Sequence, residues 1–222
     1  AMTDTRQLFL ERVRQALRMG ARPGDSAEIE PRGNIGYQGA GPDPAARFCQ
    51  QFTAAGGQAH QVANHAIAID KVLELVQAFD AQRILLGSGT LIDTLGLRER
   101  FKLAGRDVHS ADTARDTLFA ADIGISGVDY LVAETGSLVF LARPSEPRSL
   151  SLLPPVHIAI ASVEQIIPDL FDFFDLAGVR EDGTPPSCIS IITGPSKTGD
   201  IELKLVTGVH GPGEIHVVLV SQ

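Results

Sequence analysis

The sequence predicts an α/β protein built on an open, mostly parallel sheet that is flanked by helices. Short β-branched and aliphatic runs alternate along the chain with longer segments in which apolar residues recur every three or four positions. Glycine or proline stands at many of the junctions, as is usual between regular elements. With 222 residues, of which 44% are hydrophobic, the chain can bury a large core without disulfides or metals.

Helices are expected where apolar residues keep a helical spacing and a capping or breaking residue stands at the boundary. They fall at residues 3–17, 44–55, 69–79, 91–101, 112–120 and 163–174. Strands are expected at residues 60–63, 83–86, 156–160, 188–192 and 215–220, and a hairpin over residues 129–141. Residues 122–127 contain two glycines and are expected to form a turn. His157 interrupts an aliphatic strand, which favours a hydrogen-bonded core histidine over a ligand.

The N-terminal region has a different composition from the rest. Between about residues 20 and 44 the chain is rich in Gly, Pro, Asp and Ala and shows little periodicity, which is typical of a linker. We therefore expect residues 1–35 to form an N-terminal helix and flexible linker, and residues 36–222 to form the α/β domain.

The net charge and the cysteine spacing argue against several classes of protein and site. A net charge of −8 argues against a nucleic-acid face, which needs a basic surface. Cys49 and Cys188 match no CxxC spacing, so they indicate neither a zinc site nor an iron–sulfur cluster. They are expected to be buried residues of a reduced, cytoplasmic protein, although a disulfide between them stays open. No apolar run approaches the roughly 18 to 20 residues that span a bilayer, and the N-terminus lacks a signal-peptide core.

A polar loop follows the expected strand at residues 188–192. Its candidate ligand-binding residues are Gly194, Ser196, Lys197, Thr198, Asp200 and Glu202. In an open α/β sheet, ligands bind at the carboxyl ends of strands, so this loop is a candidate site in which Lys197 and backbone N–H groups hold an anion. The alternative is a solvated connecting loop.

A second candidate anion site follows the strand at residues 83–86. Gly87, Ser88, Gly89 and Thr90 lead into an expected helix and could present backbone N–H groups to a ligand. The segment lacks both the Rossmann fingerprint and the P-loop lysine, so a tight turn before a helix explains it equally well.

Two titratable residues are candidates for catalysis. Glu134 stands at the tip of the expected hairpin beside Gly136, where a carboxylate could act as a nucleophile or general base. His210 lies among glycines and a proline and could act as an acid or base. A solvated turn and a structural histidine are the respective alternatives. Together with the two glycine-bearing loops, these residues predict one shared pocket for a small carboxylate or other anion.

Five ordered segments carry a resemblance to one family. They are Gly127-Val128-Asp129, Ala133-Glu134-Thr135-Gly136, the run from Leu150 to His157, the run from Gly194 to Glu202, and Gly208-Val209-His210-Gly211-Pro212. In this combination the sequence resembles the lactate-utilisation protein C family, the LUD-domain (LutC/YkgG) group, over nearly the whole chain. Gly199 and Gly213 depart mildly from the family pattern, which puts only the rigidity of their loops in question.

The resemblance implies a fold and a role. The family is similar in fold to the NagB/RpiA/CoA-transferase-like superfamily, and it takes part in oxidation of L-lactate to pyruvate with partner proteins that carry iron–sulfur clusters. Because this chain has neither a cysteine cluster nor a dinucleotide fingerprint, we expect no cofactor in it and place the iron–sulfur clusters in the partner subunits. The first hypothesis is thus an accessory subunit of an L-lactate dehydrogenase complex; homo-oligomerisation stays open.

Two other functions stay open at this point. One is a free-standing enzyme that acts on a phosphorylated sugar, a CoA thioester or a folate, as members of the superfamily do. The other is a binding or regulatory module whose pocket only senses a ligand. In some CoA transferases a glutamate is the nucleophile, and the same role for Glu134 is inferred by analogy only.

Overall fold

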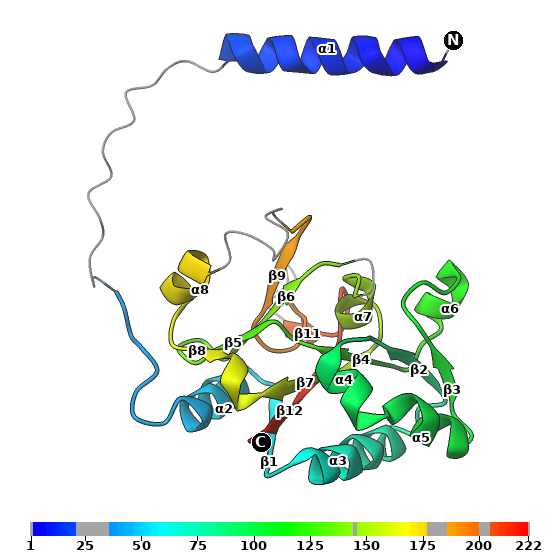
Figure 1. Ribbon diagram of the computed structural model, residues 1–222, viewed down its shortest axis with the longest axis vertical. Helices are drawn as coiled ribbons and strands as arrows, with labels where there is room; N and C mark the ends of the chain where they lie inside the picture. Colours follow the sequence, from blue (N-terminus) through cyan, green and yellow to red (C-terminus); the bar gives the residue numbers. More distant parts are fainter. Residues whose placement is uncertain (1, 21–35, 144–145, 177–185, 200–204, 222) are drawn as a thin grey trace. The chain divides into compact units, whose positions relative to one another are not determined.

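The computed structural model describes residues 2–20, 36–143, 146–176, 186–199 and 205–221 (Figure 1). The contacts divide the chain into two units, Ala1–Gly36 and Tyr37–Gln222. The first unit contains helix α1 (Met2–Gly20), where expected. All other elements belong to the second unit. Among the residues described, no helix combines the length and the apolar character needed to cross a membrane.

A six-stranded sheet forms the centre of the second unit. Its order is β1-β12-β7-β4-β2-β3, and every neighbouring pair is parallel. The strands are β1 (Gln58–Val62), β2 (Arg83–Leu86), β3 (Asp107–His109), β4 (Ile123–Gly127), β7 (Val156–Ser162) and β12 (Glu214–Val220). The predicted α/β class with a mostly parallel sheet is therefore confirmed.

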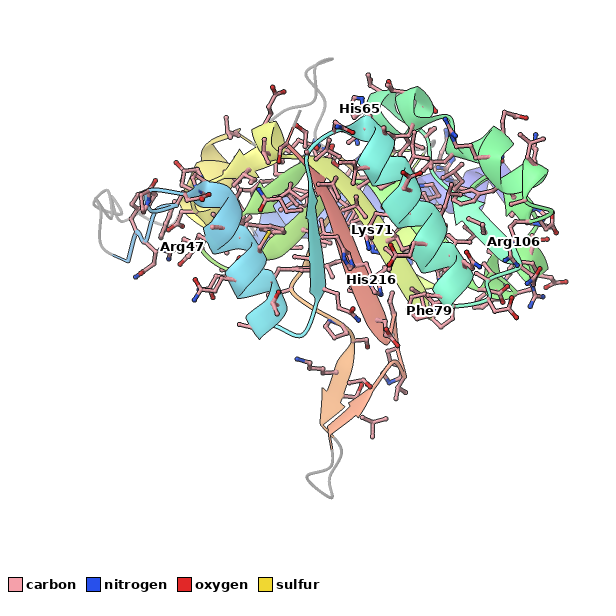
Figure 2. The ribbon with its side chains drawn as sticks, turned by 90° about the horizontal axis from the view of Figure 1, so that it is seen from below. Arg47, His65, Lys71, Phe79, Arg106 and His216 are labelled. Atoms are coloured by element: carbon pink, nitrogen blue, oxygen red, sulfur yellow. The ribbon has the colours of Figure 1, made fainter. Side chains whose placement is uncertain are left out.

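Helices cover both faces of the sheet. Side chains of a strand alternate between the two faces, and each face therefore carries apolar side chains that helices bury. The helices of this unit are α2 (Pro44–Ala54), α3 (His65–Ala78), α4 (Thr90–Leu95), α5 (Leu97–Leu103), α6 (Arg115–Phe119), α7 (Ser149–Leu152) and α8 (Leu170–Leu176), with a 3₁₀ turn η1 at Val163–Gln165. On one face Ile158 and Val218 pack with residues of α3, α4 and α5, and on the other Ala159 and Val217 pack with Phe48 of α2. Seen from below, α2 and α3 lie on opposite sides of β1 and β12 (Figure 2).

A second sheet packs on the α2 side. It has the order β8-β5-β6-β9 and contains β5 (Tyr130–Val132), β6 (Ser137–Leu141), β8 (Ile166–Ile167) and β9 (Ile189–Ile192). The β5–β6 pair is the predicted hairpin, and β9 runs antiparallel to β6. Strands β10 (Lys197–Gly199) and β11 (Leu205–Thr207) form a separate antiparallel pair. Leu131 and Leu138 of this sheet join the same core cluster as Phe48.

Two predicted elements differ in type from the observed ones. Residues 122–127 were expected to turn, but β4 is a central strand of the parallel sheet. Its Gly124 serves packing, because a Cβ there would lie 2.1 Å from the carbonyl oxygen of Leu150 in α7. Residues 163–174 were expected to be one helix, but they form η1, β8 and α8, since Ile166 and Ile167 pair with β5.

The extent of other helices also differs from expectation. The helix expected at residues 69–79 begins at His65. Asn64 is its N-cap, because the Asn64 side chain accepts a hydrogen bond of 3.1 Å from the Ile67 N–H. The helix expected at residues 91–101 is divided into α4 and α5 by Gly96, which has a φ of 57°.

Candidate functional site

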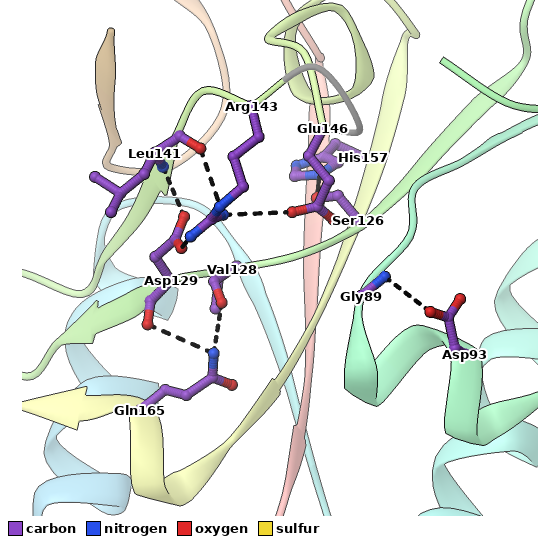
Figure 3. Close-up of polar contacts among 10 residues, drawn as sticks. All are labelled: Gly89, Asp93, Ser126, Val128, Asp129, Leu141, Arg143, Glu146, His157 and Gln165. Carbon is purple, nitrogen blue, oxygen red and sulfur yellow. Dashed lines mark hydrogen bonds and ion pairs between the residues drawn. The ribbon is translucent and has the colours of Figure 1, made fainter. Parts of the chain in front are cut away.

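A cleft of about 370 Å³ opens at the carboxyl ends of β2, β4 and β7 (Figure 3). The residues that line it come from the loop after β2 and the start of α4, the end of β4 and the residue after it, the loop after β6, β7 and η1. They are Ser88, Gly89, Thr90, Leu91, Ile92, Gly127, Val128, Arg143, Glu146, Ile160 and Gln165. This is the position at which open α/β sheets bind ligands.

The loop after β2 forms one wall of the cleft. The Gly87 N–H bonds to the Ile125 carbonyl at 2.8 Å, which extends the β2–β4 pairing into the loop. Gly89 then takes a φ of 137° and its N–H donates to the Asp93 carboxylate at 3.3 Å. The Gly89 N–H therefore already has a partner within the loop, whereas Ser88 and Thr90 contribute to the lining of the cleft.

Arg143 stands on the opposite wall and is held by fixed partners. Its guanidinium forms an ion pair with Asp129 and donates to the Leu141 carbonyl at 3.4 Å. Asp129 in turn accepts the Leu141 N–H at 2.6 Å, so the loop after β6 and the carboxylate fix each other. The hydrogen bond that Arg143 donates to Asp129 raises the pKa of Arg143, and the cation remains charged at any physiological pH.

Glu146 lies beside Arg143 but does not form a close pair with it. Two backbone hydrogen bonds of 3.1 and 3.3 Å join the main chains of the two residues, and the Nη1 to Oε2 distance is 3.8 Å. Its Oε1 is buried and has no hydrogen-bond partner among the residues described. Burial first, and then the charge of Asp129, raise the pKa of Glu146. A Cβ at position 87 would lie 3.1 Å from Oε1, so Gly87 makes room for the carboxyl.

Gln165 closes the third side of the cleft. Its Oε1 accepts the Ser162 N–H at 2.8 Å. Its Nε2 donates to the Val128 carbonyl at 2.5 Å (Figure 3). These contacts form a capping box at η1 and tie the end of β7 to the chain that follows β4. These hydrogen bonds hold the Gln165 amide in a fixed position at the edge of the cleft.

A small inner cavity of about 20 Å³ lies behind Glu146. Ser126, Gly127, Glu146, Arg148 and Ser151 are among its lining residues, and the volume suits about one water molecule. Ser126 Oγ and His157 Nε2, 2.9 Å apart, form a buried hydrogen bond there. Burial lowers the pKa of His157 to about 3, so the imidazole is neutral and the predicted hydrogen-bonded core histidine is confirmed.

The loop at residues 194–199 lies elsewhere. Ser196 exchanges backbone hydrogen bonds of 2.9 and 3.0 Å with Pro212 and Gly208, which brings it to the His210 segment. This segment leads into the amino end of β12, at the opposite end of the parallel strands from the cleft. The carboxyl-end argument failed because β9, which precedes the loop, belongs to the other sheet.

The remaining residues of that predicted site have the following positions. Lys197 donates to the Ala55 carbonyl at 2.7 Å, at the carboxyl end of α2. Gly194 also lies against Ala55, Thr198 is part of β10, and the side chain of His210 is exposed. The predicted ligands Asp200 and Glu202 lie outside the residues described.

Glu134 occupies a third place. Its carboxyl shares a hydrogen bond with Asp169, and burial first and Asp169 second raise its pKa. Arg47, in the first turn of α2, is the cation that acts on it, whereas Lys197 contacts the last turn, roughly 12 Å farther along the helix. The loop at residues 87–90 thus lies at the opposite end of the parallel strands from Lys197 and the His210 segment, so these residues do not all meet in one pocket. A catalytic role for Glu134 or His210 and a ligand-binding role for Lys197 stay predictions.

Sequence reasoning missed Arg143, Glu146 and Gln165 as site residues. The charged loop that follows the hairpin was a signal, but its meaning depends on β4 being a central strand, which was mistaken for a turn. Cys49 and Cys188 are free thiols, so the disulfide alternative is not realised. Within the described ranges no group of three or more His, Cys, Asp or Glu side chains is placed to hold a metal ion.

The fold and cleft define the class: an α/β domain with a ligand cleft at the carboxyl ends of a parallel sheet. The LUD domain matches residues 45–220, and the chain belongs to the LUD domain family. The resemblance seen in the sequence motifs is thereby confirmed.

Several curated relatives carry the name Lactate utilization protein C. That of Halalkalibacterium halodurans is 35% identical over 150 residues, which are 65% of this chain and 64% of the relative. That of Bacillus subtilis is 41% identical over 103 residues, or 46% and 43% of the two chains. That of Anoxybacillus flavithermus is 30% identical over 161 residues, or 71% and 72%. The chain thus covers less than two thirds of the first two relatives.

A solved structure supports the fold. A DUF162 family protein from Deinococcus radiodurans superposes with a TM-score of 0.55 at 22% identity, covering 81% of this chain and 100% of that one. At this identity the likeness concerns the fold alone.

Proposed function

We propose that the chain is an accessory subunit of an iron–sulfur L-lactate oxidation system and that it binds a small carboxylate in the cleft at the carboxyl ends of β2, β4 and β7. The names of its relatives support the lactate-utilisation role. In this proposal the iron–sulfur clusters reside in the partner proteins, and this chain contributes the ligand pocket.

The position of Arg143 is the observation that carries the pocket. A guanidinium has five N–H donors in a planar fork, and Asp129 and Leu141 engage only part of it. Arg143 also lines the cleft, whereas Lys197, the cation expected from the sequence, donates to the end of α2. A carboxylate in the cleft would therefore be recognised by Arg143.

The accessory role is tested by recovery of the complex. The tagged chain is isolated anaerobically from its native cells, and the iron content and lactate oxidation of the recovered material are measured. We expect co-purification of iron-containing partners and activity that the chain alone lacks. Recovery of the chain by itself, without iron or activity, would overturn the accessory role.

The pocket is tested by paired substitutions of arginine. Arg143→Gln should abolish binding of L-lactate to the purified chain and lower lactate-dependent growth. Arg83→Gln is the matched control, because Arg83 is half-exposed at the amino end of β2, where it pairs with Asp122 at 3.4 Å. Equal binding by the two variants would show that Arg143 is not the carboxylate ligand.

A second function, a free-standing enzyme, is favoured by Glu146. A carboxyl group with a raised pKa and a buried, unpartnered oxygen beside a cleft has the properties of an acid–base residue. Such an enzyme would turn over a phosphorylated sugar, a CoA thioester or a folate without partner proteins. Turnover of such a substrate by the purified chain, lost in Glu146→Gln, would favour this function over the accessory role.

A further inference from the structure

Glu146 and Arg143 are positioned to act on neighbouring groups of one ligand. Both line the cleft, and reciprocal backbone hydrogen bonds join their main chains. The 3.8 Å between Nη1 and Oε2 exceeds hydrogen-bond distance, so their hydrogen-bonding capacity is not spent on each other. A ligand with a carboxylate and a second oxygen on the adjacent carbon could contact both residues at once.

The charges around Glu146 decide in which state it meets such a ligand. Asp129 and Asp93 act on it as negative charges and raise its pKa, whereas the positive charge of Arg143 and a backbone hydrogen bond from Gly127 lower it. Arg148 lines the inner cavity with it. Ser126, which also borders the cavity, is uncharged, and so is its hydrogen-bond partner His157. A bound carboxylate would add one more negative charge and engage Arg143, the cation that now offsets the charge of Glu146. The complex is therefore favoured when Glu146 carries a proton.

Protonation also gives Glu146 a hydrogen-bond donor. Its ionised form only accepts hydrogen bonds, whereas the protonated form has one O–H. The surroundings of Glu146 suit an uncharged carboxyl group. The cavity beside it has the volume of about one water molecule, and the nearby Ser126–His157 pair carries no charge that would need to be balanced. A hydroxyl or carbonyl oxygen of the ligand can accept from this O–H.

We propose that the cleft selects 2-hydroxy and 2-oxo carboxylates, with Arg143 binding the carboxylate and a protonated Glu146 donating to the oxygen on the adjacent carbon. This deepens the proposed function and rests on it. The proton comes from solvent when the ligand binds and returns when it leaves; no bond of the ligand is broken. Binding is thus coupled to the uptake of up to one proton.

The test is calorimetric titration of the purified chain with L-lactate, pyruvate and propionate, which lacks the second oxygen. Titrations are run at pH 6 and pH 8 in two buffers that differ in ionisation enthalpy, so that proton uptake is measured directly. We expect lactate and pyruvate to bind about tenfold more tightly than propionate, the effect of one hydrogen bond. Affinity should fall from pH 6 to pH 8, with uptake at pH 8 approaching one proton per ligand.

Variants separate the two roles. Glu146→Gln retains a donor but cannot titrate, so it should keep the preference for lactate over propionate and lose the pH dependence and proton uptake. Glu146→Ala should bind the three ligands alike, and urea unfolding checks that both variants fold. Glu99→Gln, the same change at an exposed residue of α5, should behave as wild type.

The outcomes distinguish this inference from the function on which it rests. If wild type binds propionate and lactate equally, or binds lactate without proton uptake, the inference is overturned while the carboxylate pocket stands. If wild type binds none of the three acids, both are overturned.

Discussion

The carboxyl groups of Glu134 and Asp169 share a hydrogen bond where the β5–β6 turn meets the start of α8. Asp169 is fully buried and accepts the N–H groups of Gln38 at 2.9 Å and Phe171 at 3.1 Å. Burial acts to raise the pKa of Asp169, but these hydrogen bonds lower it overall, whereas the pKa of Glu134 is raised. When the pair shares a proton, these opposite shifts favour Glu134 as its carrier and donor and Asp169 as the acceptor.

This pair predicts unequal effects of substitution. Glu134→Gln keeps a donor toward Asp169 and should change the free energy of unfolding by less than about 1 kcal/mol. Asp169→Ala removes the acceptor of two backbone N–H groups and should cost about 2 to 4 kcal/mol, measured by urea denaturation. A Glu134→Gln variant that is stable yet inactive in the assembled lactate-oxidising complex would support the catalytic role expected from the sequence.

Two buried histidines predict acid sensitivity. Burial lowers the pKa of His157 to about 3 and that of His216, which lies against Phe79 on the α3 side of β12, to about 4 (Figure 2). The unfolded chain, with histidine pKa values near 6.5, binds more protons below that pH than the folded one. The free energy of unfolding should therefore fall between pH 6.5 and 5, by roughly 2 kcal/mol per histidine.

Denaturation with urea at both pH values measures this loss. His216→Gln should show a loss about half as large, and His65→Gln, at an exposed position, should match wild type. Equal stability of wild type at pH 6.5 and 5 would contradict the neutral state of the two imidazoles.

Gly136 predicts a steric effect. It has a φ of 65°, and a Cβ there would lie 2.1 Å from the backbone nitrogen of Phe52, so the hairpin packs directly on α2. Gly136→Ala should cost about 3 kcal/mol or more, because the clash adds to backbone strain. Gly105 has a φ of 72° and nothing within 4 Å, so Gly105→Ala should show only the strain, about 1 to 2 kcal/mol. Similar losses in thermal or urea unfolding would refute the close approach.

Substitution of Lys197 should lower stability slightly and leave ligand binding unchanged. Its ammonium donates to the Ala55 carbonyl, one of the free acceptors at the carboxyl end of α2. Because the side chain is exposed, Lys197→Met should cost at most about 1 kcal/mol. Carboxylate affinity in the cleft should be unchanged; a loss of affinity in calorimetry would return the ligand site to this loop.

The sequence predicted those elements whose local pattern agrees with their tertiary role. Strands β2, β7 and β12 were found because buried parallel strands are continuous apolar runs. Strand β4 was mistaken for a turn because Gly124 and Gly127 resemble turn residues, although Gly124 is required by the approach of α7. The segment at residues 163–174 kept helical spacing, but pairing of Ile166 and Ile167 with β5 decided its structure.

By itself, the sequence determined the α/β class and the family, since alternating apolar periods and ordered motifs are local properties of the chain. Only the tertiary structure decided which loops meet. The order β7-β4-β2 brings Ser88, Glu146 and Gln165 to one cleft, whose lining does not include Glu134, Lys197 or His210. Strand order depends on long-range pairing and packing between distant segments, which local periodicity does not encode.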